Sequence, residues 1–295
     1  MTLADLLAAL PQSNLSDMPF PQALLGAFRR KSITFANGLT DETTVVYWFQ
    51  SKTFTIDLRL PDGPATPPED RQGWVGDTLW DDAAQQLSWT INRSYQPRNQ
   101  WPEPATLSFI GNCVLEYAPS GAYVEDWRQQ STTGPLLGLR LLSLFNETTG
   151  HTHAMDGGLI VAGDYAAYAQ SRLPAVDAAL DEAGDLAKAL ADGIATEGQI
   201  ESYEVSVATN GLAITHSTQP ERLGQNLVNG DFKINTEGKV ILSTSIKGAR
   251  CQLHFAVDCH QSNVAFANKS LCSMESLQWA ERENEHLLRH AKIVR

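Results

Sequence analysis

Aromatic and charged side chains recur together on segments of this sequence that alternate as β-strands do. On one such segment Tyr123, Glu125 and Trp127 are two residues apart, and side chains at that spacing lie on the same face of a strand. A carboxylate or guanidinium enclosed inside a protein must be paired, or its pKa must shift towards neutrality. Tryptophan walls with a few such fixed polar groups are the usual composition of a small-molecule site.

The side chains that we expect to contact a ligand come from several of these segments, and they are Trp48, Gln50, Asp57, Trp89, Arg93, Tyr123 and Trp127, together with Asp164 and Tyr168. Glu125, Glu116 and Arg59 are candidate catalytic groups, because a buried carboxyl can transfer a proton and a guanidinium can stabilise a developing anion. An ion pair of Asp57 with Arg59, or of Glu116 with Arg93, beside these tryptophans would make such a site. The alternative is that the aromatic residues form an ordinary core and the charges face solvent.

His151 and His153 are separated by one residue, a spacing that places both imidazoles on one face of an extended segment. Such a pair can supply two metal ligands, and a third could come from Glu147, Asp156, His216 or His254. Because the pair follows Gly150 in an expected loop, we favour solvent-exposed histidines and predict no metal site. The sequence has no P-loop, no dinucleotide-binding GxGxxG, no HExxH and no GxSxG elbow, and we expect no cofactor.

Asp164 lies next to Tyr165 and close to Tyr168 and Arg172. A carboxyl beside a phenol can act as an acid–base pair when burial tunes its pKa. An aspartate in a turn that precedes a strand with tyrosines explains the same residues, and we favour that interpretation.

Four cysteines, Cys113, Cys251, Cys259 and Cys272, include no CxxC pair. The N-terminal 22 residues have an apolar run but no basic region before it, so they do not match a secretory signal. These two observations predict reduced thiols and a cytoplasmic protein. Cys259 with the adjacent His260 is a weak candidate for a nucleophile pair, because neighbouring strand residues point to opposite faces.

The formal net charge is −12, from 22 Lys and Arg against 34 Asp and Glu. Apart from residues 29–31 the basic side chains are scattered singly, which argues against nucleic acid and against an anionic membrane surface as partners. No stretch approaches the 18 or so apolar residues that a membrane helix needs.

The first half contains about eight expected strands with no helix between them, at residues 31–36, 43–50, 53–60, 74–79, 86–93, 106–110, 113–117 and 122–128. Alternation is clearest over 54–60, where apolar residues alternate with Thr55, Asp57 and Arg59. Eight short antiparallel strands predict an up-and-down barrel, because a closed sheet has no edge strand with unpaired backbone groups. A two-sheet sandwich is the alternative.

The second half is also strand-rich, with strands expected at 136–146, 152–170, 200–208, 212–217, 230–235, 239–245 and 251–257. Residues 156–158 predict a hairpin turn within the second of these segments. Helices are expected at 3–10, 176–195 and 273–293. The predicted division is a barrel with its leading helix at 1–130, a second barrel-like half at 131–272, and a C-terminal helix at 273–295.

Several motifs resemble an uncharacterised bacterial family of two-part, lipocalin-like (calycin-type) β-barrel proteins. They are FRR at 28–30, DETTVVYWFQ at 41–50, DLRLP at 57–61, WTINR at 89–93, YVEDW at 123–127 and VAGDYAAYA at 161–169. The chain departs from the pattern where Phe28 replaces a tryptophan and where the order of residues after Trp89 differs. The resemblance implies the fold and brings no reaction with it.

The leading functional prediction is therefore the binding of a small apolar or amphipathic molecule in the lumen of the barrel. One alternative is an enzyme without a cofactor, a lyase, isomerase or hydrolase, with a carboxyl as general acid or base and Arg59 as anion stabiliser. Another is a protein-interaction module whose terminal helices dock on a partner or a second copy, and a homodimer is expected in that case.

Overall fold

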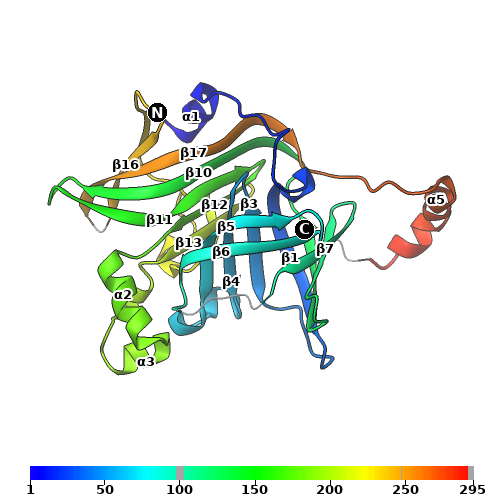
Figure 1. Cartoon of the computed structure of the whole chain (residues 1–295), viewed down its shortest axis with the longest axis horizontal. Helices are drawn as coiled ribbons and strands as arrows, with labels where there is room; N and C mark the ends of the chain where they lie inside the picture. Colours follow the sequence, from blue (N-terminus) through cyan, green and yellow to red (C-terminus); the bar gives the residue numbers. More distant parts are fainter. Residues whose placement is uncertain (98–102, 247, 292–295) are drawn as a thin grey trace.

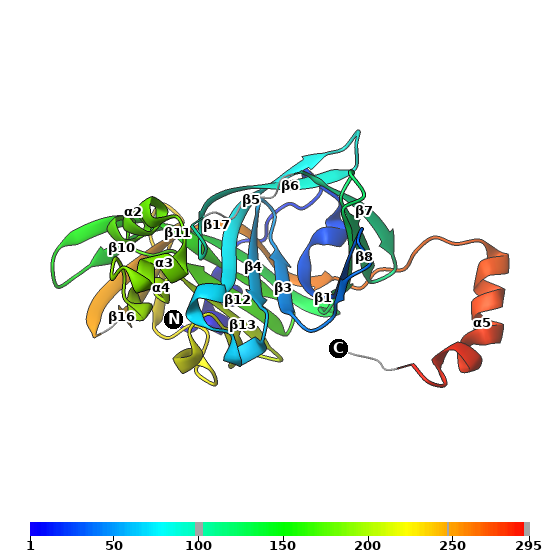
Figure 2. The ribbon, with the colours of Figure 1, turned by 90° about the horizontal axis from the view of Figure 1, so that it is seen from below.

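The computed structural model describes residues 1–97, 103–246 and 248–291. Within this part of the chain, the strands of the first half form one antiparallel sheet that closes on itself (Figures 1 and 2). They are β1 (Gly26–Phe35), β2 (Thr40–Asp41), β3 (Val45–Gln50), β4 (Phe54–Leu60), β5 (Gln72–Asp81), β6 (Gln86–Ser94), β7 (Ala105–Ile110), β8 (Cys113–Tyr117) and β9 (Tyr123–Gln129).

Closure comes from the pairing of β1 with both β3 and β9, while the two-residue β2 extends β1 as a hairpin. Eight strands therefore make an up-and-down antiparallel barrel, and the prediction of a mainly β fold with such a barrel is confirmed. The sandwich alternative is wrong.

The second half forms another antiparallel sheet, in the order β14-β13-β12-β11-β10-β17-β16-β15. Its strands are β10 (Thr133–Asn146), β11 (His151–Ala162), β12 (Tyr165–Gln170), β13 (Glu204–Thr209), β14 (Ile214–Ser217), β15 (Asp231–Ile234), β16 (Val240–Ile246) and β17 (Ala249–Ala265). We expected a barrel-like half, but among the described residues no pairing joins β14 to β15, so this sheet has two edges.

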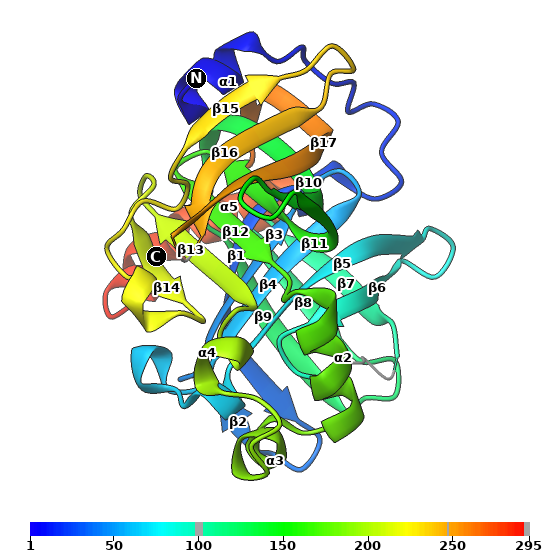
Figure 3. The ribbon, with the colours of Figure 1, turned by 90° about the vertical axis from the view of Figure 1, so that its left-hand side faces the viewer.

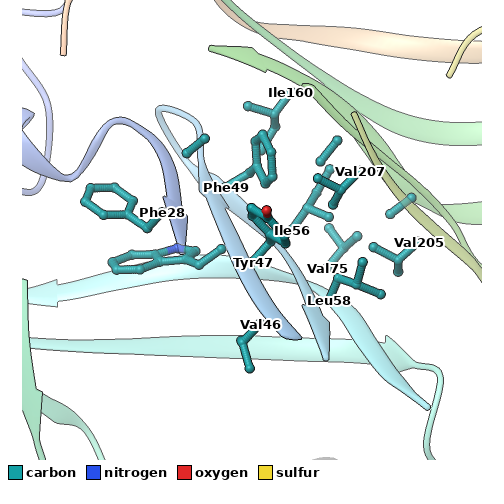
Figure 4. Packing of buried hydrophobic residues seen from close by; sticks show 14 of the residues in the cluster. Phe28, Val46, Tyr47, Phe49, Ile56, Leu58, Val75, Ile160, Val205 and Val207 are labelled. Carbon is teal, nitrogen blue, oxygen red and sulfur yellow. The ribbon is translucent and has the colours of Figure 1, made fainter. Parts of the chain in front are cut away.

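The barrel packs its outer surface against one face of the second sheet. Figure 4 shows Phe49, Ile56, Leu58 and Val75 of the barrel pointing towards Ile160, Val205 and Val207 of β11 and β13, and all seven are buried. The apolar residues of β4 thus face away from the lumen, because the second sheet and not the barrel interior covers them. Thr55, Asp57 and Arg59 consequently point inwards.

Two glycines permit this close approach of the sheets. A Cβ on Gly73 of β5 would lie 2.7 Å from a methyl carbon of Val205, and one on Gly138 of β10 would overlap the Ser51 hydroxyl. Ser51 and Thr53, in the turn between β3 and β4, donate hydrogen bonds to the Asp258 carboxylate of β17. Arg172 adds a polar link, because its buried guanidinium donates to the carbonyls of Ser94, Tyr95 and Ile200.

The opposite face of the second sheet has a core of its own, covered by α1 (Leu3–Ala9). Leu3, Leu6 and Leu10 are buried there, near β15 and β17 (Figure 3). Thr2 and Asp5 form a capping box at the start of α1, which satisfies backbone N–H groups that the first turn leaves free.

The remaining helices lie outside the two sheets: α2 (Pro174–Ala183), α3 (Leu186–Ala191), α4 (Glu197–Ile200) and α5 (Met274–Leu288), with short 3₁₀ turns at Gln22–Leu24, Gly63–Ala65, Pro68–Asp70 and Pro220–Arg222. Helix α5 lies away from both sheets in Figures 1 and 2, and none of its residues is buried. In the described part of the chain no helix has the length and apolar character that crossing a membrane requires.

Two local predictions are wrong. The expected hairpin at 156–158 is absent, because β11 runs unbroken to Ala162 and the chain turns at Gly163 and Asp164. The single helix expected at 176–195 is divided into α2 and α3 by Gly184, which adopts φ 72° at the C-cap of α2, a left-handed conformation that glycine accepts at little cost.

Candidate ligand site in the barrel

An aromatic wall lines the lumen of the barrel. Phe28 stacks on Trp48 with ring centroids 4.9 Å apart, and Trp48 meets the rings of Trp127 and Trp89 edge-on at 5.6 and 6.3 Å. Trp89 in turn meets Trp74 at 5.5 Å. The predicted residues Trp48, Trp89 and Trp127 therefore belong to one cluster. Edge-to-face contacts of this kind are favourable between aromatic rings and stabilise it.

One end of this wall is held by hydrogen bonds among neutral side chains. The Trp48 indole donates to the Thr55 hydroxyl at 2.6 Å, and the Gln50 amide donates to the Thr78 hydroxyl at 2.8 Å. Gln50 is fully buried and also donates to the carbonyls of Ser51 and Phe54. The predicted ligand contact Gln50 therefore already supports the β3–β4 turn.

Charged side chains gather towards the other end of the lumen. Arg30 donates to Glu125 at 2.7 Å and to Asp41 at 2.8 Å. Arg59 pairs with Asp57 at 2.9 Å, which is the first of the two ion pairs that the sequence suggested. Burial opposes the charge of Arg59, but the carboxylates of Asp57 and Glu125 nevertheless hold its pKa above the usual value.

Glu116 is a carboxyl with no ion pair in the described structure. It is 4% exposed and lies directly opposite Glu125 in the β8–β9 register. Burial, followed by repulsion from Glu125, raises the pKa of Glu116 to about 8. The Tyr123 hydroxyl lies 3.5 Å from it, and burial followed by repulsion from Glu116 raises the Tyr123 pKa above its usual value. At neutral pH the Glu116 carboxyl therefore carries its proton.

Arg93 does not belong to the lumen, and the suggested pair with Glu116 is wrong. One extra residue in β6 shifts the register between Val75 and Gly76, so Arg93 lies opposite Val75 on the outer face. There its guanidinium lies 3.7 Å from Asp177. A bulge of one residue exchanges the two faces of a strand beyond it, and the alternation in 86–93 does not reveal it.

Asp164 and Tyr168 are also placed away from the lumen. Asp164 is exposed in the turn between β11 and β12. Tyr168 lies in the core of the far face of the second sheet, where its hydroxyl donates to Gln170 at 2.7 Å. Asp164 thus lies in a turn that precedes a strand with tyrosines, which is the interpretation that we favoured.

His151 and His153 lie at the start of β11 with ring centroids 6.5 Å apart. Among the described residues no group of three or more His, Cys, Asp and Glu side chains is arranged to hold a metal ion. All four cysteines are free. Burial raises the pKa of Cys259 to about 11, which disfavours the thiolate that nucleophilic chemistry needs.

The structure adds lumen residues that sequence reasoning missed, namely Arg30, Asp41, Thr55, Trp74 and Thr78. Arg30 follows Phe28 at the spacing that shares a strand face, and this was the available signal. For three of the others, the signal was their position opposite predicted residues: Trp74 faces Asp57, Thr55 faces Gln50 and Thr78 faces Trp89. Asp41 lies opposite Ile33, and the sequence carried no such signal for it.

Two hollows lie outside the barrel. A cavity of about 270 Å³ on the second sheet is lined by Tyr168, Gln170, Glu204, Arg222, Leu227 and Leu242, among others. Its Arg222 is already bonded to Glu204 and to the carbonyls of Asn226 and Leu227. A wider groove of about 650 Å³ runs between β6 and α2 past Arg93 and Asp177.

Comparison with known proteins finds a distant structural likeness and no family. No model of a protein family matches the sequence, and no curated protein matches it. A solved structure, described as a lipocalin-like protein from Bacteroides uniformis ATCC 8492, shares 10% sequence identity with this chain. The match covers 36% of this chain and 98% of that one, with a TM-score of 0.29.

Proposed function

We propose that this protein binds a small amphipathic molecule in the lumen of the N-terminal barrel. The observation that carries the proposal is the division of one lumen into an aromatic wall and a charged end. Trp89, which is partly exposed beside the buried rings of Trp48 and Trp127, offers apolar contact area, and the groups around Glu116 offer polar contacts that fix an orientation. Ligand sites combine these two features.

Solvent reaches the charged end of the lumen. The side chains of Arg59 and Asp41 are 14% and 29% exposed, whereas Trp48 and Trp127 are each 2% exposed. An amphipathic ligand would enter with its apolar part towards the tryptophans and leave its polar group among the charges. That orientation removes apolar surface from water, which is the main favourable contribution to such binding.

The test is a thermal-shift screen of single-chain amphiphiles with the full chain, followed by titration of the hits against tryptophan fluorescence. A ligand at 100 times its Kd stabilises the folded state by about 2.7 kcal/mol. Trp89→Leu is expected to weaken binding at least tenfold, whereas Trp279→Leu on the unburied helix α5 leaves it unchanged. A panel in which no amphiphile alters either the melting temperature or the emission refutes the proposal.

A second candidate, acid–base catalysis, is favoured by one specific observation. A carboxyl whose pKa lies near neutrality, as that of Glu116 does, is suited to proton transfer at physiological pH. Incubation of the protein with bound ligands, followed by mass spectrometry, tests this function. Product that forms with the wild type and not with Glu116→Gln supports it, and recovery of every bound ligand unchanged contradicts it.

A further inference from the structure

The lumen holds more buried acidic groups than basic ones. Asp57, Glu116 and Glu125 are 2%, 4% and 3% exposed, and Arg30 and Arg59 are the guanidiniums beside them. Both guanidiniums already have carboxylate partners. A buried charge without a partner is costly, so the acidic group left over keeps its proton until a ligand supplies a cation to pair with it.

Glu116 is that group. Its cross-strand partner is Glu125, and side chains directly opposite each other in an antiparallel pair have Cβ atoms about 5 Å apart. Glu125 is bonded to Arg30, whereas Glu116 forms no salt bridge among the described residues, and the nearby Arg59 is bonded to Asp57. The Trp127 indole, on the same strand as Glu125, is buried and lies beside the Glu116 carboxyl. This end of the lumen therefore contains a buried carboxyl that the protein does not pair with a cation of its own.

We propose that the barrel selects ligands whose polar group is a cation, an aliphatic amine protonated at neutral pH, and binds that ammonium at Glu116 beside Glu125. The proposal rests on the proposed binding function and specifies the ligand class. An ammonium has three N–H donors, which can reach both carboxyls. The indole faces of the aromatic wall add cation–π attraction.

Ligands with an anionic or neutral polar group fit less well. A carboxylate would have to displace Asp57 from Arg59, or Glu125 from Arg30, and these pairs have N–O distances of 2.9 and 2.7 Å. It would also meet repulsion from Glu125. A hydroxyl could hydrogen-bond to protonated Glu116 but would gain no charge pairing.

Binding of an ammonium implies release of a proton. The groups that face Glu116 are Glu125 and Tyr123 on β9, Asp57 and Arg59 on β4, and more distantly Arg30 on β1 and Glu103 before β7. Because repulsion and burial keep Glu116 protonated in the free protein, arrival of a cation favours its ionised form. The carboxylic acid then gives its proton to solvent, and the bound state is an ammonium–carboxylate pair.

The experiment compares octylamine, octanol and octanoate as probes of one chain length, using calorimetry with the full chain at pH 7. We expect octylamine to bind at least tenfold more tightly than the other two. Titration in two buffers of different ionisation enthalpy is expected to show release of up to one proton per amine bound. Glu116→Gln should remove both the preference for the amine and the proton release, and Glu42→Gln, at an exposed site, should change neither.

The outcomes separate this inference from the proposed function. If octanoate binds more tightly than the other two probes, the inference is overturned, and the polar group of the ligand lies at the guanidiniums of Arg30 and Arg59 instead. Equal affinities for the three probes also overturn it but leave amphiphile binding intact, whereas no binding by any probe overturns both. The proton release is measured on the wild type, so the inference can be refuted even if Glu116→Gln does not fold.

Discussion

Replacing Glu116 with glutamine should change how the stability of the barrel depends on pH. In the folded protein, burial and then repulsion from Glu125 raise the pKa of Glu116 from 4.5 to about 8, whereas in the unfolded chain it titrates near its usual value. Between these pH values the folded state keeps the proton and the unfolded state releases it. The stabilisation from protonated Glu116 is therefore complete below pH 4.5 and is lost as the pH rises through 8.

The size of the effect follows from that interval. Each pH unit removes about 1.4 kcal/mol, so from pH 4.5 to 8 the free energy of unfolding of the wild type should fall by up to roughly 4–5 kcal/mol through this group. Glutamine does not titrate. The Glu116→Gln variant should therefore gain stability relative to the wild type by about that amount across the interval.

Urea unfolding at pH 4.5, 6 and 8, followed by tryptophan fluorescence, measures this difference. Six of the seven tryptophans lie between residues 48 and 127, so the emission reports on the barrel. Glu42→Gln, at an exposed position, is the matched control and should parallel the wild type. If Glu116→Gln also parallels the wild type at the three pH values, Glu116 is ionised in the folded lumen and the reasoning fails.

Three other predictions follow from burial. Ile56→Ala at the barrel–sheet interface should cost about 2–4 kcal/mol in urea unfolding, since Ile56 is 0% exposed, whereas Leu79→Ala at a 51% exposed site should stay within about 0.5 kcal/mol; equal costs would contradict the assigned faces. A thiol-reactive dye at pH 8 should label exposed Cys272 rapidly and buried Cys259 only after unfolding; early labelling of Cys259 would refute its burial. Deletion of 273–295 should move the melting temperature by less than about 2 °C, because no residue of α5 is buried, and a larger drop in calorimetry would show that the helix supports the fold.

The sequence was sufficient to predict the barrel because its signal is local. Strand alternation at 54–60 and short turns between neighbouring strands depend on residues close together in the chain. The ion pair of Asp57 with Arg59 was likewise predictable, since the two residues are two apart on one strand. The set Tyr123, Glu125 and Trp127 shares a face for the same reason.

The sequence could not predict features that depend on distant residues. Arg93 was misassigned because a one-residue bulge in β6 reverses its face. Asp164 and Tyr168 were added to the site because of nearby tyrosines, but their strand packs elsewhere in the molecule. The continuous β11 across residues 156–158 was missed because pairing with β10 and β12 outweighs the turn preference of Asp-Gly-Gly.

Alternation shows that a strand has two faces but does not show which face lies inside a barrel. In β4 the apolar face with Ile56 packs on the second sheet (Figure 4), and the polar face with Asp57 lines the lumen. Both faces are buried, so hydrophobicity by itself does not separate inside from outside. That choice is made by the second sheet, whose contacting residues Ile160, Val205 and Val207 lie more than 100 residues from Ile56 in sequence. Covering the apolar face from outside leaves the charged face to fill the barrel.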